Sequence, residues 1–291
     1  MKRFFTIATI ALSFISCGEN GSLIPEPTPP PVERIPINIS TSIIRATDSA
    51  FEAGDKVGIF VVNEPNTLAA SGNYVDNMGF TYSGQWAPDE EIFWKDQTTK
   101  ADFYCYYPYA ESVNTKAHTF ATKADQSTLA NYKASEFLWG KTELVTPTAD
   151  VVPITVNHKL SNAIVIVEPG NGYTAESLAA SDIKVKIANV KTEMLVNLAT
   201  GAVEASGVPT TVTPLNEGTY YRALIVPQTV PEDALIIVTV DGVTYTLVKA
   251  FKFEANTQHC FTVKVNKVNN GVNIGIGGWV IDGTDNGGSV E

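Results

Sequence analysis

The residues of this 291-residue chain that could support catalysis are few and widely separated. His118, His158 and His259 lack the spacing that would place two of them on one metal ion, and each is typical of a surface or hydrogen-bonded strand histidine. The acidic run from Asp89 to Glu91 is typical of a solvated turn. The sequence contains no GxSxG, HExxH, phosphate-binding glycine loop or CxxC motif. It therefore predicts no enzyme, no cofactor and no metal site.

Cys17 is the residue with the clearest chemical role. It follows a basic start and an apolar segment, Phe4 to Ile15, that is too short to cross a bilayer. This is where the cysteine of a bacterial lipobox is lipidated, although the usual leucine three residues earlier is Phe14. We predict a lipoprotein signal peptide over residues 1–17 with Cys17 as the lipid anchor. The alternative is an ordinary signal peptide with an incidental cysteine.

A proline-rich tether is predicted over residues 18–34, with five prolines between Pro25 and Pro31. In a polyproline II conformation, at about 3.1 Å per residue, it could hold the folded part up to about 50 Å from the lipid. Such a spacer suits a protein that projects from an outer membrane.

The net charge excludes one class of partner. It is −11 for the whole chain, and removal of Lys2 and Arg3 with the leader lowers it to about −13. An acidic surface repels phosphate backbones, so we expect no nucleic-acid partner.

Short runs rich in Val, Ile, Thr and Tyr alternate with turn signals about every ten residues and predict an all-β protein. Asp241-Gly242, between two such runs, predicts a type I′ hairpin. One short helix is expected over residues 125–135, with Ser127 as its N-cap. Because the composition shifts near residue 160, we predict two tandem β-sandwich domains and a polar tail, over residues 35–160, 161–281 and 282–291.

Cys105 and Cys260 lie in apolar, strand-like runs that are far apart in the sequence. We expect two separate buried thiols rather than a disulfide.

An aromatic run from Phe103 to Tyr109 is the best candidate for a ligand site. Tyr104 and Tyr106, with Trp94, could stack on sugar rings. Strand alternation sends Phe103, Cys105 and Tyr107 to one face, however, so at least half of the run is expected in the core.

The segment from Ile35 to Arg45 reads as a strand with one buried face. Isoleucines at positions 35, 37, 39 and 43 alternate with polar residues or proline. The strand follows a tether and ends at Arg45, a cut site for a trypsin-like protease. Its removal after folding would leave an apolar groove that a strand from another subunit could fill.

The order and spacing of several short motifs resemble the fimbrillin-like family of Bacteroides-type surface fimbriae, over nearly the whole mature chain. No single motif is specific. After the lipidated Cys17, the motifs are Arg45–Asp48, Phe51–Asp55, Asp102–Tyr109, Phe137–Gly140, His158–Ser161, Val226–Gln228 and Trp279.

The resemblance implies two β-sandwiches of transthyretin-like topology in a subunit exported as a lipoprotein. It implies a cut of the Arg45–Ala46 bond, loss of the first strand, and filling of the groove by a strand from a neighbouring fimbrial subunit. The competing bond is Arg34–Ile35, whose cleavage would remove only the tether. A lipid-anchored precursor at the outer membrane would then become part of a cell-surface fimbria.

The C-terminal pattern bears on the position in the fibre. Val272, Ile274 and Ile276 alternate, but glycines interrupt them, and glycines weaken strand pairing. This favours a tip or accessory subunit, with a host or bacterial surface ligand, over a shaft subunit that donates a strand. The alternatives are an uncut anchor subunit and a monomeric glycan-binding surface lipoprotein.

Overall fold

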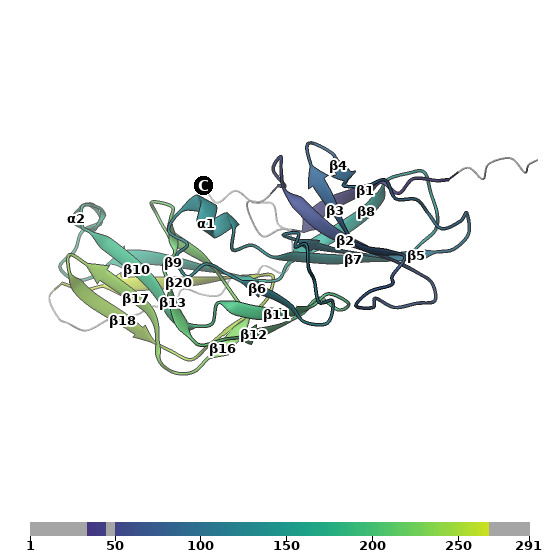
Figure 1. Ribbon diagram of the computed structural model, residues 1–291. Coiled ribbons are helices and arrows are strands. Elements are labelled where there is room, and N and C mark those ends of the chain that lie inside the picture. The colour runs from purple at the N-terminus through teal and green to yellow at the C-terminus, as the bar shows by residue number, and fades with distance from the viewer. Residues whose placement is uncertain (1–33, 45–49, 268–291) are drawn as a thin grey trace, which may run out of the picture. The chain divides into compact units, whose positions relative to one another are not determined.

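The computed structural model describes residues 34–44 and 50–267, and their regular secondary structure is almost entirely β-strand, as predicted (Figure 1). The two helices are short: α1 (Leu129–Lys133) and α2 (Ala175–Ala179). Neither they nor any other helix in the described ranges has the length and apolarity needed to span a bilayer.

The largest sheet among the described residues has seven strands and contains the first described strand at one edge. In spatial order its strands are β1 (Ile39–Ile44), β8 (Val152–His158), β7 (Leu138–Val145), β5 (Ala101–Tyr107), β2 (Lys56–Asn63), β3 (Val75–Tyr82) and β4 (Trp86–Pro88). Only the β1–β8 pair in this sheet is parallel.

The central strands β2 and β5 of this sheet are buried on both faces. One face carries Ile59 and Phe103 into a core cluster with Ile154, and the other carries Phe60 and Tyr104 into a second cluster. The run from Val57 to Val62 is apolar on both sides, a pattern that predicts a central strand, and β2 does lie between β3 and β5.

A three-stranded sheet covers the second face. Its strands are β6 (His118–Ala121), β11 (Glu193–Asn197) and β12 (Ala202–Ser206). Met194 and Val196 of β11 share a buried cluster with Tyr104. Because β6 pairs with β11, strand pairing crosses the domain boundary expected near residue 160, and that division remains a prediction.

The remaining strands enclose a third core cluster, which includes Ile187, Ile225 and Val263. Two four-stranded sheets and a two-stranded sheet supply them: β13 (Thr210–Val212), β10 (Ile183–Val190), β17 (Ala234–Val240) and β18 (Val243–Val248); β14 (Leu215–Asn216), β15 (Tyr221–Ile225), β9 (Ser161–Pro169) and β20 (Thr257–Val265); β16 (Gln228–Val230) and β19 (Phe251–Phe253). The predicted Asp241-Gly242 turn joins β17 to β18, with positive φ at both residues.

The predicted helix is shorter than expected, and its N-cap was wrong. Thr128, not Ser127, caps α1 by accepting a hydrogen bond from the Asn131 backbone. The preceding residues are held by other partners, because Asp125 forms a β-bridge with Thr213 and the Gln126 side chain is fully buried. The Gln126 amide pairs with both backbone groups of Leu224, at 2.8 and 2.9 Å.

One of the two cysteine expectations was also wrong. Cys105 is buried, whereas Cys260 is exposed, and both are free thiols. Alternation along β20 explains this, because His259 and Phe261 point into the core and Cys260 therefore points out.

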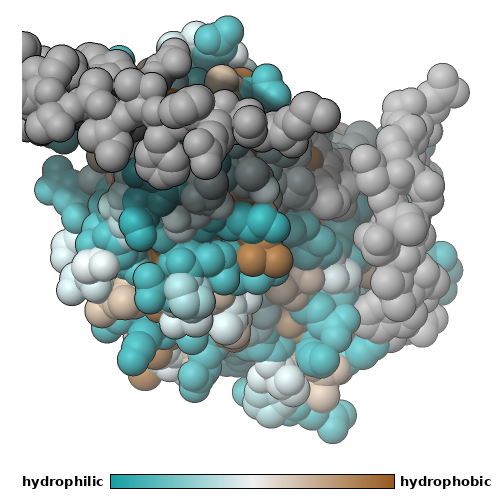
Figure 2. Space-filling model, turned by 90° about the vertical axis from the view of Figure 1, so that its right-hand side faces the viewer, coloured by the Kyte–Doolittle hydropathy of each residue, from teal (hydrophilic) through white to brown (hydrophobic). Residues whose placement is uncertain are grey.

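The face shown in Figure 2 is largely hydrophilic where the structure describes it, with apolar side chains appearing singly or in small groups.

The burial of β1 leads to a testable prediction. Ile39 is 4% exposed, whereas its neighbour Ser40 points to solvent. We expect Ile39→Ala to lower the free energy of unfolding by about 2–4 kcal/mol, because it removes core contacts and leaves a cavity. The matched variant Ser40→Ala should change it by less than about 0.5 kcal/mol. Urea denaturation of both variants measures this, and equal effects would show that β1 does not belong to the core.

Candidate functional site

The first strand is held at the edge of its sheet by a limited set of contacts. It pairs with β8 in parallel register, from Ile39 beside Val152 to Ile44 beside Asn157. Among the described strands, β8 is its only ladder partner. The alternation predicted from the sequence is confirmed, because Ile37 and Ile39 are buried while Asn38 is exposed.

The residues just before β1 pair with a second part of the chain. The Ile37 amide donates to the Ile92 carbonyl and the Trp94 amide donates to the Ile35 carbonyl, both at 2.9 Å. The Trp86 indole N–H adds a bond of 2.9 Å to the Thr41 hydroxyl. The first strand therefore lies between β8 and the segment that follows β4.

The inward side chains supply most of the stabilisation. Ile37 and Ile39 are buried in the same cluster as Ile59 and Phe103, and Ile43 packs against that cluster. Full burial of one isoleucine side chain is worth about 1.5–3 kcal/mol. The whole segment is thus stabilised by a few apolar contacts, the ladder with β8, and the hydrogen bonds to Trp86, Ile92 and Trp94.

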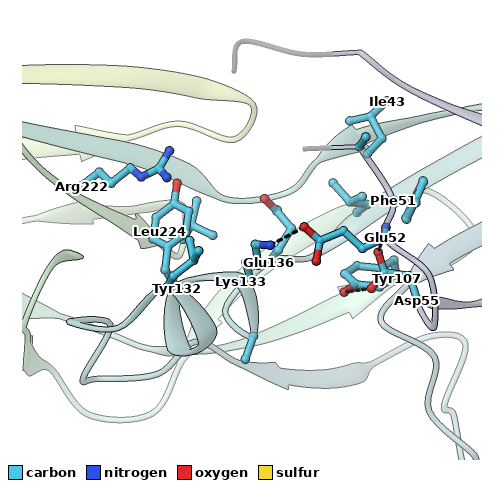
Figure 3. A pocket seen from close by; sticks show the side chains of 14 residues that line it. Ile43, Phe51, Glu52, Asp55, Tyr107, Tyr132, Lys133, Glu136, Arg222 and Leu224 are labelled. Carbon is cyan, nitrogen blue, oxygen red and sulfur yellow. Dashed lines mark hydrogen bonds and ion pairs between the residues drawn. The ribbon is translucent and has the colours of Figure 1, made fainter. Parts of the chain in front are cut away.

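A cavity of about 310 Å³ lies beside the end of β1 (Figure 3). Ile43, Phe51 and Tyr107 line one side of it, and Arg222 and Leu224 of β15 line another. Its wall therefore combines apolar surface, aromatic rings and charged groups.

Three carboxylates line this cavity, and each has a partner. Glu52 pairs with Lys133 of α1, and Asp55 accepts a hydrogen bond of 3.0 Å from the Tyr107 hydroxyl. Glu136 lies 2.9 Å from His158. Burial raises the pKa of Tyr107 far above its ordinary value, and the charges of Asp55, Glu136 and Glu52 raise that pKa further.

The residues predicted to be lipidated or cut lie mostly outside the described ranges. Cys17, Arg45 and Ala46 are among them, as are the C-terminal residues from Gly271 to Gly278 and the polar tail 282–291. Arg34, the competing cut site, is described and exposed, and its guanidinium lies 4.0 Å from the centre of the Phe93 ring.

The sugar-stacking expectation for the aromatic run is corrected by the structure. Trp94 and Tyr104 are each 4% exposed and Tyr106 is 1% exposed. Because β5 is covered on both faces, its alternating side chains enter two different core clusters: Phe103 lies in one, and Tyr104 and Tyr106 lie in the other. These three rings leave no free face on which a sugar could stack.

The partners of the first strand were missed by sequence reasoning. Trp86 and Ile92–Trp94 lie about fifty residues beyond β1, and no local pattern connects them to it. The cavity residues Phe51, Glu52 and Asp55 were recognised only as part of the motif Phe51–Asp55, and the part played by Arg222 had no signal in the sequence.

The histidines are dispersed in the structure as they are in the sequence. His118 and His259 are buried, and His158 pairs with Glu136. Across residues 34–44 and 50–267, no group of three or more His, Cys, Asp or Glu side chains is placed to hold a metal ion.

Solved structures of Bacteroides proteins share this fold. A solved structure described as a cell adhesion protein of Bacteroides uniformis superposes with a TM-score of 0.65, at 21% identity, over 83% of this chain and 96% of that chain. This likeness shows the shared fold.

The sequence comparisons give the family. The model of the fimbrillin-like family matches residues 45–279, so the chain belongs to that family and is a fimbrial subunit. A Bacteroides uniformis protein named as the fimbrium subunit Fim1C is 25% identical over 294 residues, 94% of this chain and 92% of that protein. A Bacteroides ovatus protein named as the fimbrium tip subunit Fim1C is 27% identical over 106 residues, 35% of this chain and 19% of that protein.

The buried histidines predict how stability depends on pH. Burial lowers the pKa of His118 below its ordinary value, and the same holds for His259. On unfolding, each recovers a pKa near about 6.5, so the unfolded chain binds more protons below that pH. The stabilisation is therefore complete above about pH 6.5 and is lost as the pH falls towards the lower pKa of the folded state.

We expect His118→Phe to reduce this loss of stability, because the phenyl ring keeps the packing against Tyr106 and Phe137 without taking up a proton. Between pH 8 and 5.5 the unfolding free energy of the variant should fall less than that of the wild type, by at most about 1.4 kcal/mol. Denaturant unfolding at both pH values measures the difference. An identical fall in the two proteins would contradict a buried neutral His118.

Proposed function

We propose that this chain is a tip or accessory subunit of a surface fimbria and that it accepts a neighbour's strand in place of β1. A cut at Arg45–Ala46 would release residues 35–45 with the tether. The released position would then be filled by a strand from another subunit, with main-chain hydrogen bonds supplying affinity and alternate side chains supplying register. In this proposal the chain is structural and adhesive, not catalytic.

The placement of β1 is the observation that carries the proposal. It is the first strand of the chain and lies at a sheet edge, with β8 as its ladder partner. Because β1 is an edge strand, it could leave while the other strands of the sheet keep their pairing with one another. Its departure would expose an apolar groove lined by residues of the cluster that now contacts Ile37 and Ile39, and it would free the edge of β8.

Lipidation at Cys17 explains how the precursor reaches its site of assembly. A signal peptide over residues 1–17 delivers the chain to the outer membrane, and the tether over residues 18–34 holds the folded part away from the lipid. The cut that removes β1 would also separate the subunit from its anchor. One proteolytic step would thus prepare the groove and release the subunit.

Two observations support the tip or accessory position. The alternating apolar residues near the C-terminus are interrupted by four glycines between Gly271 and Gly278, which makes a poor donor strand. A protein named as a fimbrium tip subunit also matches about a third of this chain. In this position the chain receives a strand and gives none.

The cut site predicts the N-terminus of the assembled subunit. Mass spectrometry of subunits from sheared fimbriae should identify Ala46 as the first residue. Arg45→Gln should block this processing and assembly, whereas the matched variant Arg34→Gln should leave both unchanged.

Other N-termini would point to other roles. Lipidated Cys17 in assembled fibres would overturn the cleavage proposal and favour an anchor subunit. Ile35 as the first residue would show that only the tether is removed and that β1 stays in place.

A further inference from the structure

One side of the cavity at the end of β1 is acidic. We define the acidic lobe as Glu52, Asp55 and Glu136 with the rings of Phe51 and Tyr107. Figure 3 shows Phe51, Glu52 and Tyr107 on the side of the cavity where Ile43 lies, with Arg222 and Tyr132 at the opposite side.

The charge of the lobe is unbalanced. Glu52 pairs with Lys133 and Glu136 pairs with His158, whereas Asp55 accepts a hydrogen bond from the neutral Tyr107 hydroxyl. Arg222 pairs with Glu217 and lies over the Tyr132 ring, 4.5 Å from its centre. The lobe therefore combines excess negative charge with aromatic and apolar surface, which suits a long side chain with a cationic end.

The register of β1 points to this lobe. Positions 35, 37, 39 and 43 face the core, and Ile43 itself lines the cavity. In a strand that keeps this register, the next inward position is two residues beyond Ile43, about 6.6 Å further along the strand. Because Ile44 lies beside Asn157 of β8, that next position would lie beside His158, whose side chain pairs with Glu136 of the acidic lobe.

We propose that the acidic lobe selects a lysine or arginine at the second position after the Ile43 register in the strand that replaces β1. This rests on the proposed function and adds the chemistry of the partner: a neighbour's strand with alternating apolar residues and one basic residue at that end. The stem of the basic side chain packs on Phe51 and its charged end lies among the three carboxylates. Glutamate at the same position is repelled.

Peptides that copy the first strand provide a probe with a known register. The full-length chain is cut at Arg45–Ala46, checked by mass spectrometry, and offered C-terminally amidated peptides of residues 35–45. These carry the natural sequence, Arg45→Gln or Arg45→Glu. Amidation is needed because a free terminal carboxylate would cancel the charge under study.

We expect the natural peptide to bind about fivefold more tightly than the Arg45→Gln peptide, with the Arg45→Glu peptide weakest, as measured by competition against a fluorescent peptide. The preference should shrink at high salt. It should disappear in the Asp55→Asn protein, whose amide can still accept from Tyr107, and persist in Glu91→Gln, which alters an exposed carboxylate outside the lobe. Glu136→Gln provides a second test if Asp55→Asn fails to fold.

The outcomes separate the two proposals. Equal binding of all three peptides would overturn the role of the lobe while leaving strand replacement intact. Failure of every peptide to bind the cut chain would overturn both. Loss of the preference in Glu91→Gln would show a general effect of net charge and would also overturn the lobe.

Discussion

The structure depends on how a strand at the edge of a sheet buries one row of isoleucines. β1 has one ladder partner, β8, yet Ile37 and Ile39 lie in the core shared by the seven-stranded sheet. The cluster is closed only when something occupies this edge, because exposed apolar surface and unpaired main-chain groups are costly in water. The position must therefore be filled, and in the proposed assembly a strand of another subunit would fill it.

The rest of the sheet makes such an exchange tolerable. β2 and β5 are buried on both faces, by the cluster around Ile59 and by the cluster that includes Met194. Five strands lie beyond the β1–β8 pair, and none of them needs β1 as a ladder partner. The framework that defines the groove is therefore supported mainly by contacts that β1 does not make.

The contacts at the end of β1 differ in character from those along its length. Along the strand the contacts are apolar and repetitive, which gives affinity but little discrimination between similar strands. At Ile43 the wall changes to carboxylates, aromatic rings and the Lys133–Glu52 ion pair. Charged groups at one end of an apolar groove can fix register and exclude unsuitable partners, since a misplaced like charge is costly.

The sequence by itself determined the all-β class, the alternation of the first strand, the hairpin at Asp241-Gly242 and the burial of β2, because these follow from local periodicity and turn chemistry. Tertiary structure decided what periodicity cannot: that Trp94, Tyr104 and Tyr106 are core, that Cys260 is exposed, and that Gln126 shortens the expected helix. It also brought Trp86 to Thr41 and Arg222 to the cavity beside Ile43. These contacts join residues that are far apart in the sequence, and they form only when the sheets pack together.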